Sequence, residues 1–243
     1  MPLLLLACIA EPPKGGDTAA PPDEVAGEDD HFYDDSDTGS PADTGAASSG
    51  PVTYELGGTL YVVALKDPDT LGADYAHDHV VRATNWEGTA TWDLDEPADC
   101  AASITVPVDD LAVDEDEMRA LAGLSGTLSA SDRSEIRDSM LASDQLDEAA
   151  YPEITFSLDA CDAASGPTTL QGSLGLHGRT REVTVDATVS ADASAFLATG
   201  QLEFLGSDYG IEPYSAYFGA VALLDEITLV FSLEGEAEGA TAR

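Results

Sequence analysis

The four histidines His31, His77, His79 and His177 are the side chains of this sequence best suited to bind a metal ion. In a strand, His77 and His79 would lie on the same face, because successive side chains alternate between the two faces. Together with His177 they would offer the three imidazole nitrogens that many zinc sites use. However, nothing in the sequence places His177 on that face, and such pairs are more often hydrogen-bonding residues at strand ends. We therefore predict no metal site.

The patterns of nucleophilic and phosphate-binding enzymes are missing from the sequence. It has no Gly-x-Ser-x-Gly motif in a strand-turn-helix context and no glycine-rich loop that opens a helix. Carboxylates are so numerous that composition cannot single out a catalytic pair. We predict that the protein is not an enzyme and uses no cofactor.

Two cysteines lie where two expected strands could meet. Cys100 opens a strand expected at 101–108, and Cys161 follows one expected at 153–160. If these strands are antiparallel neighbours, the start of one lies beside the end of the other, and the two sulfurs can bridge. The alternative is two separate buried thiols. We predict the disulfide, which also suits an exported protein.

The first eight residues, MPLLLLAC, resemble the end of a bacterial lipoprotein signal peptide. In that pattern an apolar run leads to a cysteine, here Cys8, whose acylated thiol holds the protein at a membrane. The run is short and lacks a basic segment, so we expect the true start upstream. The alternative is a leucine-rich terminus with an ordinary cysteine. The pattern predicts an exported lipoprotein of the cell envelope, and Ile9 after the cysteine favours the outer membrane.

Composition divides the rest of the chain. Residues 9–52 are dominated by Pro, Gly, Ala, Ser, Thr and Asp, and hold too little apolar surface to offset the entropy lost on ordering. We predict a disordered acidic tether there, one domain over 53–238, and a short tail at 239–243. The formal net charge is −38, from 47 acidic residues against 9 Lys and Arg. Such a surface repels nucleic acid and anionic lipid headgroups, so we predict no nucleic-acid role.

Short segments with period-two alternation predict an all-β fold. The alternating sets are Tyr61, Val63 and Leu65; Ile104, Val106 and Val108; Leu170, Leu174 and Leu176; and Ile227, Leu229, Phe231 and Leu233. The main helix is expected near 132–141, where Asp132 and Glu135 form a capping-box variant. A shorter helical turn is expected at 115–124. An antiparallel barrel is favoured because closure leaves no exposed sheet edge.

An ordered set of motifs runs through the expected domain. The motifs are AHDHV at 76–80, SDR at 131–133, YPEITF at 151–156, LHGRT at 176–180, SDYGIEPYS at 207–215 and LDEI at 224–227. In this order and spacing the chain resembles the YceI-like family over about residues 54–236. The resemblance implies a lipocalin-like antiparallel β-barrel of about eight strands, with one or two short inserted helices, that holds an isoprenoid lipid.

The resemblance also implies which residues meet the ligand. The cavity wall would include Phe156, Leu174, Leu176, Val183, Phe204 and Phe218. The polar head of the lipid would meet His177, Tyr209 and Tyr214, although each of these residues can instead pack or stabilise a turn. On this basis we predict a carrier or reservoir for an isoprenoid lipid or a quinone, attached to a membrane by its lipid anchor. The alternative is a structural or protein-interaction barrel with a filled core and no lipid.

Overall fold

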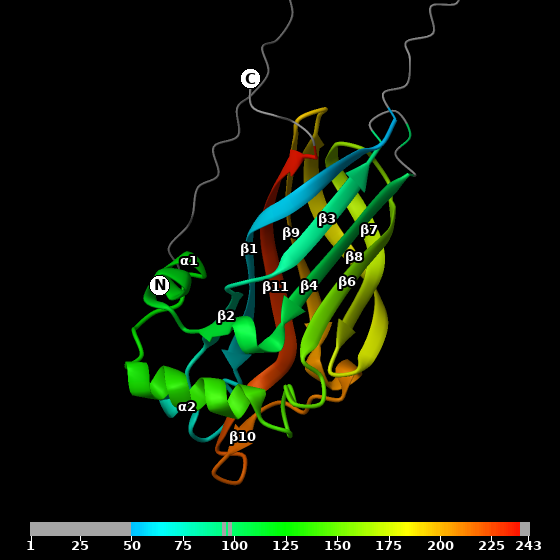
Figure 1. Cartoon of the computed structure of the whole chain (residues 1–243). Coiled ribbons are helices and arrows are strands. Elements are labelled where there is room, and N and C mark those ends of the chain that lie inside the picture. The colour runs from blue at the N-terminus through cyan, green and yellow to red at the C-terminus, as the bar shows by residue number, and fades with distance from the viewer. Residues whose placement is uncertain (1–49, 94–95, 97–98, 239–243) are drawn as a thin grey trace, which may run out of the picture. The chain divides into compact units, whose positions relative to one another are not determined.

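The computed structural model describes residues 50–93, 96 and 99–238, which form an antiparallel β-barrel (Figure 1). In this part of the chain eight strands close the barrel in the order β1–β3–β4–β6–β7–β8–β9–β11, and β11 pairs back onto β1. Their bounds are β1 Val52–Lys66, β3 Glu87–Trp92, β4 Cys100–Pro107, β6 Glu153–Cys161, β7 Gly166–Leu176, β8 Arg179–Ala191, β9 Ala195–Leu205 and β11 Val221–Ala237. The predicted fold class is confirmed. Cys8, residues 9–49 of the predicted tether and the tail at 239–243 lie outside the described residues, whereas Val52, the last residue of that predicted tether, begins β1.

Three short strands extend the barrel at one end. The first half of β1 pairs with β3, and its second half pairs with β2 (His79–Ala83). Strand β5 (Leu111–Val113) adds to β2, and β10 (Ser215–Ala216) adds to the start of β11. Short 3₁₀ turns lie at Ala73–Tyr75, Val108–Asp110 and Gly206–Tyr209. Figure 1 shows β2 and β10 at the same end of the barrel as the helices.

Period-two alternation gives each strand one apolar face toward the interior. On β11 the predicted set from Ile227 to Leu233 lines that interior. Leu229 stands in register with Val62 of β1 on one side and with Leu202 of β9 on the other. Burying a large apolar side chain of this kind stabilises the fold by roughly 1.5–3 kcal/mol.

Strand β1 has apolar side chains on both faces near its end. The alternation over residues 61–65 identifies the strand, but of that set only Tyr61 lines the cavity, together with Leu60, Val62 and Ala64 of the other face. Leu65 is 43% exposed. Because both alternating sets are apolar, the period alone does not distinguish the inner face from the outer one.

Aromatic rings close the barrel at the end where β1 begins. Trp92 and Tyr54 are fully buried, and the ring centroid of Phe196 lies 5.4 Å from each of theirs. Nε1 of Trp92 donates a hydrogen bond to the carbonyl oxygen of Ala164 at 2.7 Å. The hydroxyl of Tyr54 donates to the carbonyl oxygen of Asp192 at 2.5 Å. These bonds satisfy the polar atoms of both rings, so the rings seal this end of the barrel without leaving a buried polar group unpaired.

A disulfide braces the wall beside the sealed end. Cys100 at the start of β4 is bonded to Cys161 at the end of β6. These two strands are antiparallel neighbours, as the predicted bridge required. Cys100 also pairs with Trp92 across β3 and β4.

Two helices lie between β5 and β6, namely α1 (Asp116–Leu121) and α2 (Ala130–Leu141). Helix α2 is capped by Ser129, whose hydroxyl accepts from the backbone N–H of Asp132 while the Asp132 carboxylate accepts from the N–H of Ser129. The predicted cap of Asp132 and Glu135 was therefore wrong, because the reciprocal pair begins one turn earlier. No helix in the described ranges is long and apolar enough to cross a membrane.

Candidate functional site

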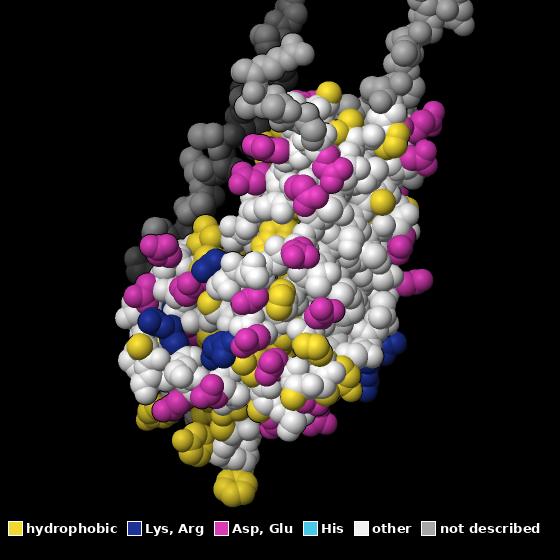
Figure 2. Space-filling view, in the orientation of Figure 1, with side chains coloured by type: hydrophobic (Ala, Val, Ile, Leu, Met, Phe, Trp, Pro, Cys, Tyr) yellow, Lys and Arg dark blue, Asp and Glu magenta, His cyan; other side chains and the backbone are white. Residues whose placement is uncertain are grey.

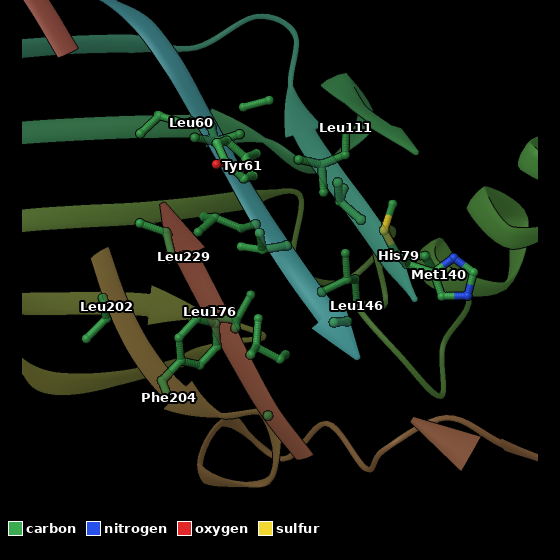
Figure 3. A pocket seen from close by; sticks show the side chains of 18 of the residues that line it. Leu60, Tyr61, His79, Leu111, Met140, Leu146, Leu176, Leu202, Phe204 and Leu229 are labelled. Carbon is green, nitrogen blue, oxygen red and sulfur yellow. The ribbon is translucent and has the colours of Figure 1, made fainter. Parts of the chain in front are cut away.

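A cavity of about 830 Å³ lies inside the barrel (Figure 3). Its wall is formed mostly by apolar side chains from the barrel strands. Examples are Leu60, Val62, Leu158, Leu202, Leu229 and Phe231. Such a wall suits an apolar molecule, because a polar ligand would lose its hydration without gaining hydrogen bonds.

The cavity is closed at one end and open at the other. Phe196 and Leu233 line the closed end and are buried. The lining residues from α2 and from the segment between the third 3₁₀ turn and β11 include exposed side chains, such as Glu135, Tyr214 and Tyr217. The mouth therefore lies at the end of the barrel that carries α2 and β10.

The charged groups that line the cavity are acidic. Asp132 and Glu135 of α2, together with Glu212 and Asp225, contribute carboxylates near the mouth. No Lys or Arg side chain lines the cavity in the described ranges. Four carboxylates without a lining cation oppose the entry of a phosphate or diphosphate head.

Four of the six residues predicted for the wall line the cavity. They are Phe156, Leu174, Leu176 and Phe204. Whether they contact a ligand stays a prediction. Val183 is only half-buried against the core and does not line the cavity. It pairs with Gly172, and the ring of Phe156 occupies the space beside that glycine, where a Cβ would lie 2.9 Å from Cζ of the ring.

Phe218 is not a wall residue, so this prediction was wrong. Its side chain is fully exposed in the turn between β10 and β11. Tyr217, Phe218 and Gly219 all have positive φ, at 52°, 61° and 84°. This left-handed turn directs the phenylalanine away from the interior, which a sequence pattern of apolar residues does not reveal.

Two of the predicted headgroup residues, His177 and Tyr209, do not line the cavity. His177 has φ of 48° in the tight turn between β7 and β8, its Nδ1 lies 3.1 Å from the carbonyl oxygen of Tyr209, and its ring packs against Tyr151. The ring of Tyr209 packs edge-on against Phe204 at 5.6 Å. Burial, with the nearby carboxylate of Asp208, raises the pKa of the Tyr209 phenol. Both residues support the wall from behind.

Tyr214, the third predicted headgroup residue, lines the mouth. It belongs to an exposed apolar rim, which we define as Leu71, Tyr75, Tyr214, Tyr217 and Phe218. Tyr75 and Tyr217 also line the cavity, so the rim is continuous with the interior wall. Figure 2 shows hydrophobic side chains gathered at this end of the molecule, among acidic ones.

The sequence did not identify a buried network that ends at the cavity. Nδ1 of His79 lies 2.6 Å from Oδ2 of Asp114, which is 0% exposed. Oδ1 of Asp114 accepts hydrogen bonds from Nη1 of Arg119 at 2.6 Å and from the backbone N–H of Val80 at 3.1 Å. Burial opposes ionisation of Asp114, but the hydrogen bonds from His79, Val80 and Arg119 outweigh it and lower the pKa of the carboxyl.

The predicted histidine pair does not form a metal centre with His177. His77 and His79 both line the mouth region, but His177 does not. Within the described ranges no group of three or more His, Cys, Asp or Glu side chains is arranged to hold a metal ion.

Comparison with protein families matches residues 67–235 to the family described as "YceI-like domain". Among solved structures, BcnA of Burkholderia cenocepacia is similar at 19% identity and a TM-score of 0.52, over 72% of this chain and 95% of that one. The YceI protein of Campylobacter jejuni is 12% identical with a TM-score of 0.48, over 64% of this chain and 83% of that one. A search of curated proteins found no match. At these identities the structural likeness to BcnA supports the fold alone.

Proposed function

Because the chain belongs to the YceI-like family, we propose that its barrel binds one isoprenoid lipid or quinone and serves as a carrier or reservoir without transforming it. The observation that supports this function is the apolar cavity with its mouth at one end. The open cavity also argues against the alternative of a barrel whose core is filled by side chains.

The size of the cavity suits a ligand of intermediate length. At roughly 30 Å³ for each water-sized group, 830 Å³ holds about 28 heavy atoms. This corresponds to five or six prenyl units of five carbons each. Burying roughly 100 Å² per unit would contribute about 2–3 kcal/mol. Several units would therefore give useful affinity after the entropy cost of association.

The ligand head is proposed to be neutral. The lining carboxylates and the lack of a lining cation in the described ranges disfavour a diphosphate. We also propose that the lipid enters through the apolar rim, which would contact a neutral membrane surface. An acylated Cys8 would anchor the protein to a membrane of the cell envelope.

Organic extraction of the purified full-length protein, followed by mass spectrometry, tests the proposed ligand class. We expect a stoichiometric isoprenoid or quinone. Empty extracts, together with no binding of added geranylgeraniol, would contradict the proposal.

A matched pair of variants on β9 tests the site. Leu202 lines the cavity and is buried, whereas Leu197 on the same strand is exposed. Leu202→Trp should fill part of the cavity and lower the bound lipid at least several-fold, while Leu197→Trp should leave it unchanged. Equal loss in both variants would point to a general effect on folding, which circular dichroism would detect.

A further inference from the structure

His79 presents its imidazole to the cavity from the start of β2. It shares the inward face of this strand with Val81 and Ala83, and all three line the cavity. Figure 3 shows His79 with Met140 and Leu146, toward the end that carries α2. A polar ring at this place in an apolar wall has to find a hydrogen-bond partner or lose its hydration without compensation.

One ring nitrogen of His79 is already engaged. Its Nδ1 lies 2.6 Å from the carboxylate of Asp114. That carboxylate is ionised at neutral pH, because its pKa is lowered. An ionised carboxylate can only accept, so Nδ1 must carry the proton of this hydrogen bond.

The charge of Asp114 is offset by Arg119, which is also buried. The guanidinium of Arg119 donates to Asp114 and to three backbone carbonyl oxygens, those of Asp78, Ser125 and Gly126. Every arm of the guanidinium is thereby occupied, so neither Asp114 nor Arg119 can swing away to serve a ligand. Their effect is to fix the orientation and the tautomer of the His79 ring.

The second ring nitrogen, Nε2, is left for the ligand. It makes no hydrogen bond with any of the described residues. When the ring is neutral and Nδ1 is protonated, Nε2 carries a lone pair and is an acceptor. The cavity therefore holds one oriented acceptor that complements a hydrogen-bond donor.

We propose that Nε2 of His79 accepts a hydrogen bond from a hydroxyl group of the bound lipid. The site would then select an isoprenoid alcohol or a quinol. A quinone or a hydrocarbon of the same chain length offers no donor, so it would bind less tightly. This inference rests on the proposed lipid binding and adds the chemistry of the head. His79 contacts the ligand, whereas Asp114 and Arg119 are positioning residues.

A matched pair of ligands tests the proposal on the unaltered protein. Geranylgeraniol and its methyl ether share one chain, but only the alcohol donates a hydrogen bond. At about pH 8 the alcohol should bind roughly 2- to 10-fold more tightly than the ether. Equal affinities would overturn the role of His79 while leaving apolar binding intact. Failure of both ligands to bind would instead contradict the proposed function.

Two variants locate the effect. His79→Phe keeps a ring in the wall but removes the acceptor, and it should abolish the preference for the alcohol. Leu197→Phe is the control, because Leu197 is exposed on β9 and does not line the cavity. It should keep the preference. A preference that survives in His79→Phe would overturn the proposal.

Histidine ring NMR supplies a readout that does not depend on a variant folding. Long-range ¹H–¹⁵N correlation should show Nδ1 of His79 protonated and Nε2 unprotonated in the free protein. The Nε2 resonance should shift when geranylgeraniol is added and stay in place with the ether. Protonation at Nε2 in the free protein, or equal shifts with both ligands, would contradict the assignment.

Discussion

The backbone N–H of Gly72 donates a hydrogen bond to the carbonyl oxygen of Ala220 at 2.7 Å. This bond ties the loop between β1 and β2 to the turn between β10 and β11. A Cβ at position 72 would lie 2.7 Å from the same oxygen, so the close approach requires glycine. The two loops carry most of the exposed apolar rim. The hydrogen bond therefore holds the side chains of the rim together as one surface.

Replacing Phe218 by glycine should affect stability and lipid uptake in opposite directions. Phe218 has φ of 61°, a conformation that glycine adopts without strain. We expect Phe218→Gly to raise the free energy of unfolding by up to about 1 kcal/mol in urea titrations. The same change removes an exposed ring of the rim, so transfer of lipid from phosphatidylcholine vesicles should slow several-fold.

Asp147→Gly is the control for Phe218→Gly. Asp147 also has a positive φ, 46°, but it does not belong to the rim or line the cavity. Asp147→Gly should raise the free energy of unfolding and leave the rate of lipid transfer unchanged. Unchanged transfer in Phe218→Gly would show that the rim is not the route of entry.

Affinity should depend on the length of the ligand up to a limit. Each added prenyl unit buries more apolar surface until five or six units fill the cavity, and further units should add little. Isothermal titration with prenyl alcohols of increasing length measures this relation. Affinity should change little between low and high salt, because apolar burial dominates. A strong loss of affinity in high salt would contradict the mechanism.

Asp114→Asn should destabilise the protein most at neutral pH. The substitution leaves the guanidinium of Arg119 buried without its counter-charge, which costs about 3–5 kcal/mol in comparable pairs. Because the pKa of Asp114 is lowered on folding, its ionised form stabilises the protein above the unfolded pKa, about 3.9, and this contribution is lost as pH falls through the lower folded value. The difference in unfolding free energy between variant and wild type, measured in urea, should therefore be largest at pH 7 and become smaller below about pH 4.

Glu115→Gln provides the matched comparison for Asp114→Asn. Glu115 pairs with Arg82 at 2.7 Å, but both side chains are about one-third exposed. Solvent screens such a pair, so the loss should stay within about 1 kcal/mol. Similar losses of unfolding free energy in the two variants would mean that the buried Asp114 network stabilises the protein no more than the partly exposed pair of Glu115 and Arg82.

Removing the disulfide should lower the stability of the fold without lowering its affinity for lipid. The bridge joins residues 61 positions apart, and a loop of this length corresponds to about 4 kcal/mol in the chain-entropy relation. Cys100 and Cys161 do not line the cavity. The double variant Cys100→Ala/Cys161→Ala should therefore unfold at lower urea yet bind geranylgeraniol with wild-type affinity at low temperature. A loss of affinity in the double variant would show that the disulfide is also needed to maintain the binding cavity.

Period-two alternation was sufficient to predict an all-β fold, and on β11 it also indicated the inner face. The closed barrel followed from the argument about sheet edges and from the family resemblance. It failed to do so on β1, where Val62 and Val63 are equally apolar and only the pairing with β11 decides which points inward. Phe218 was misplaced because a run of apolar residues carries no sign of a left-handed turn. The partnership of His79 with Asp114 depends on the positive φ of Asp114, 52°, and joins residues that are 35 positions apart in the sequence. Neither of these two features can be predicted from the spacing of nearby residues in the sequence.

The packed rings of Tyr54, Trp92 and Phe196 close one end of the barrel, so within the described residues its cavity has a single entrance. Two ligand molecules cannot pass one another in such a space, so the occupant has to depart before a successor can enter. Exchange should then follow a dissociative rate law, in which the rate of replacement does not increase with the concentration of incoming lipid. The residence time of the bound lipid would then depend on the barrel and on the length of the lipid chain, and not on the concentration of free lipid.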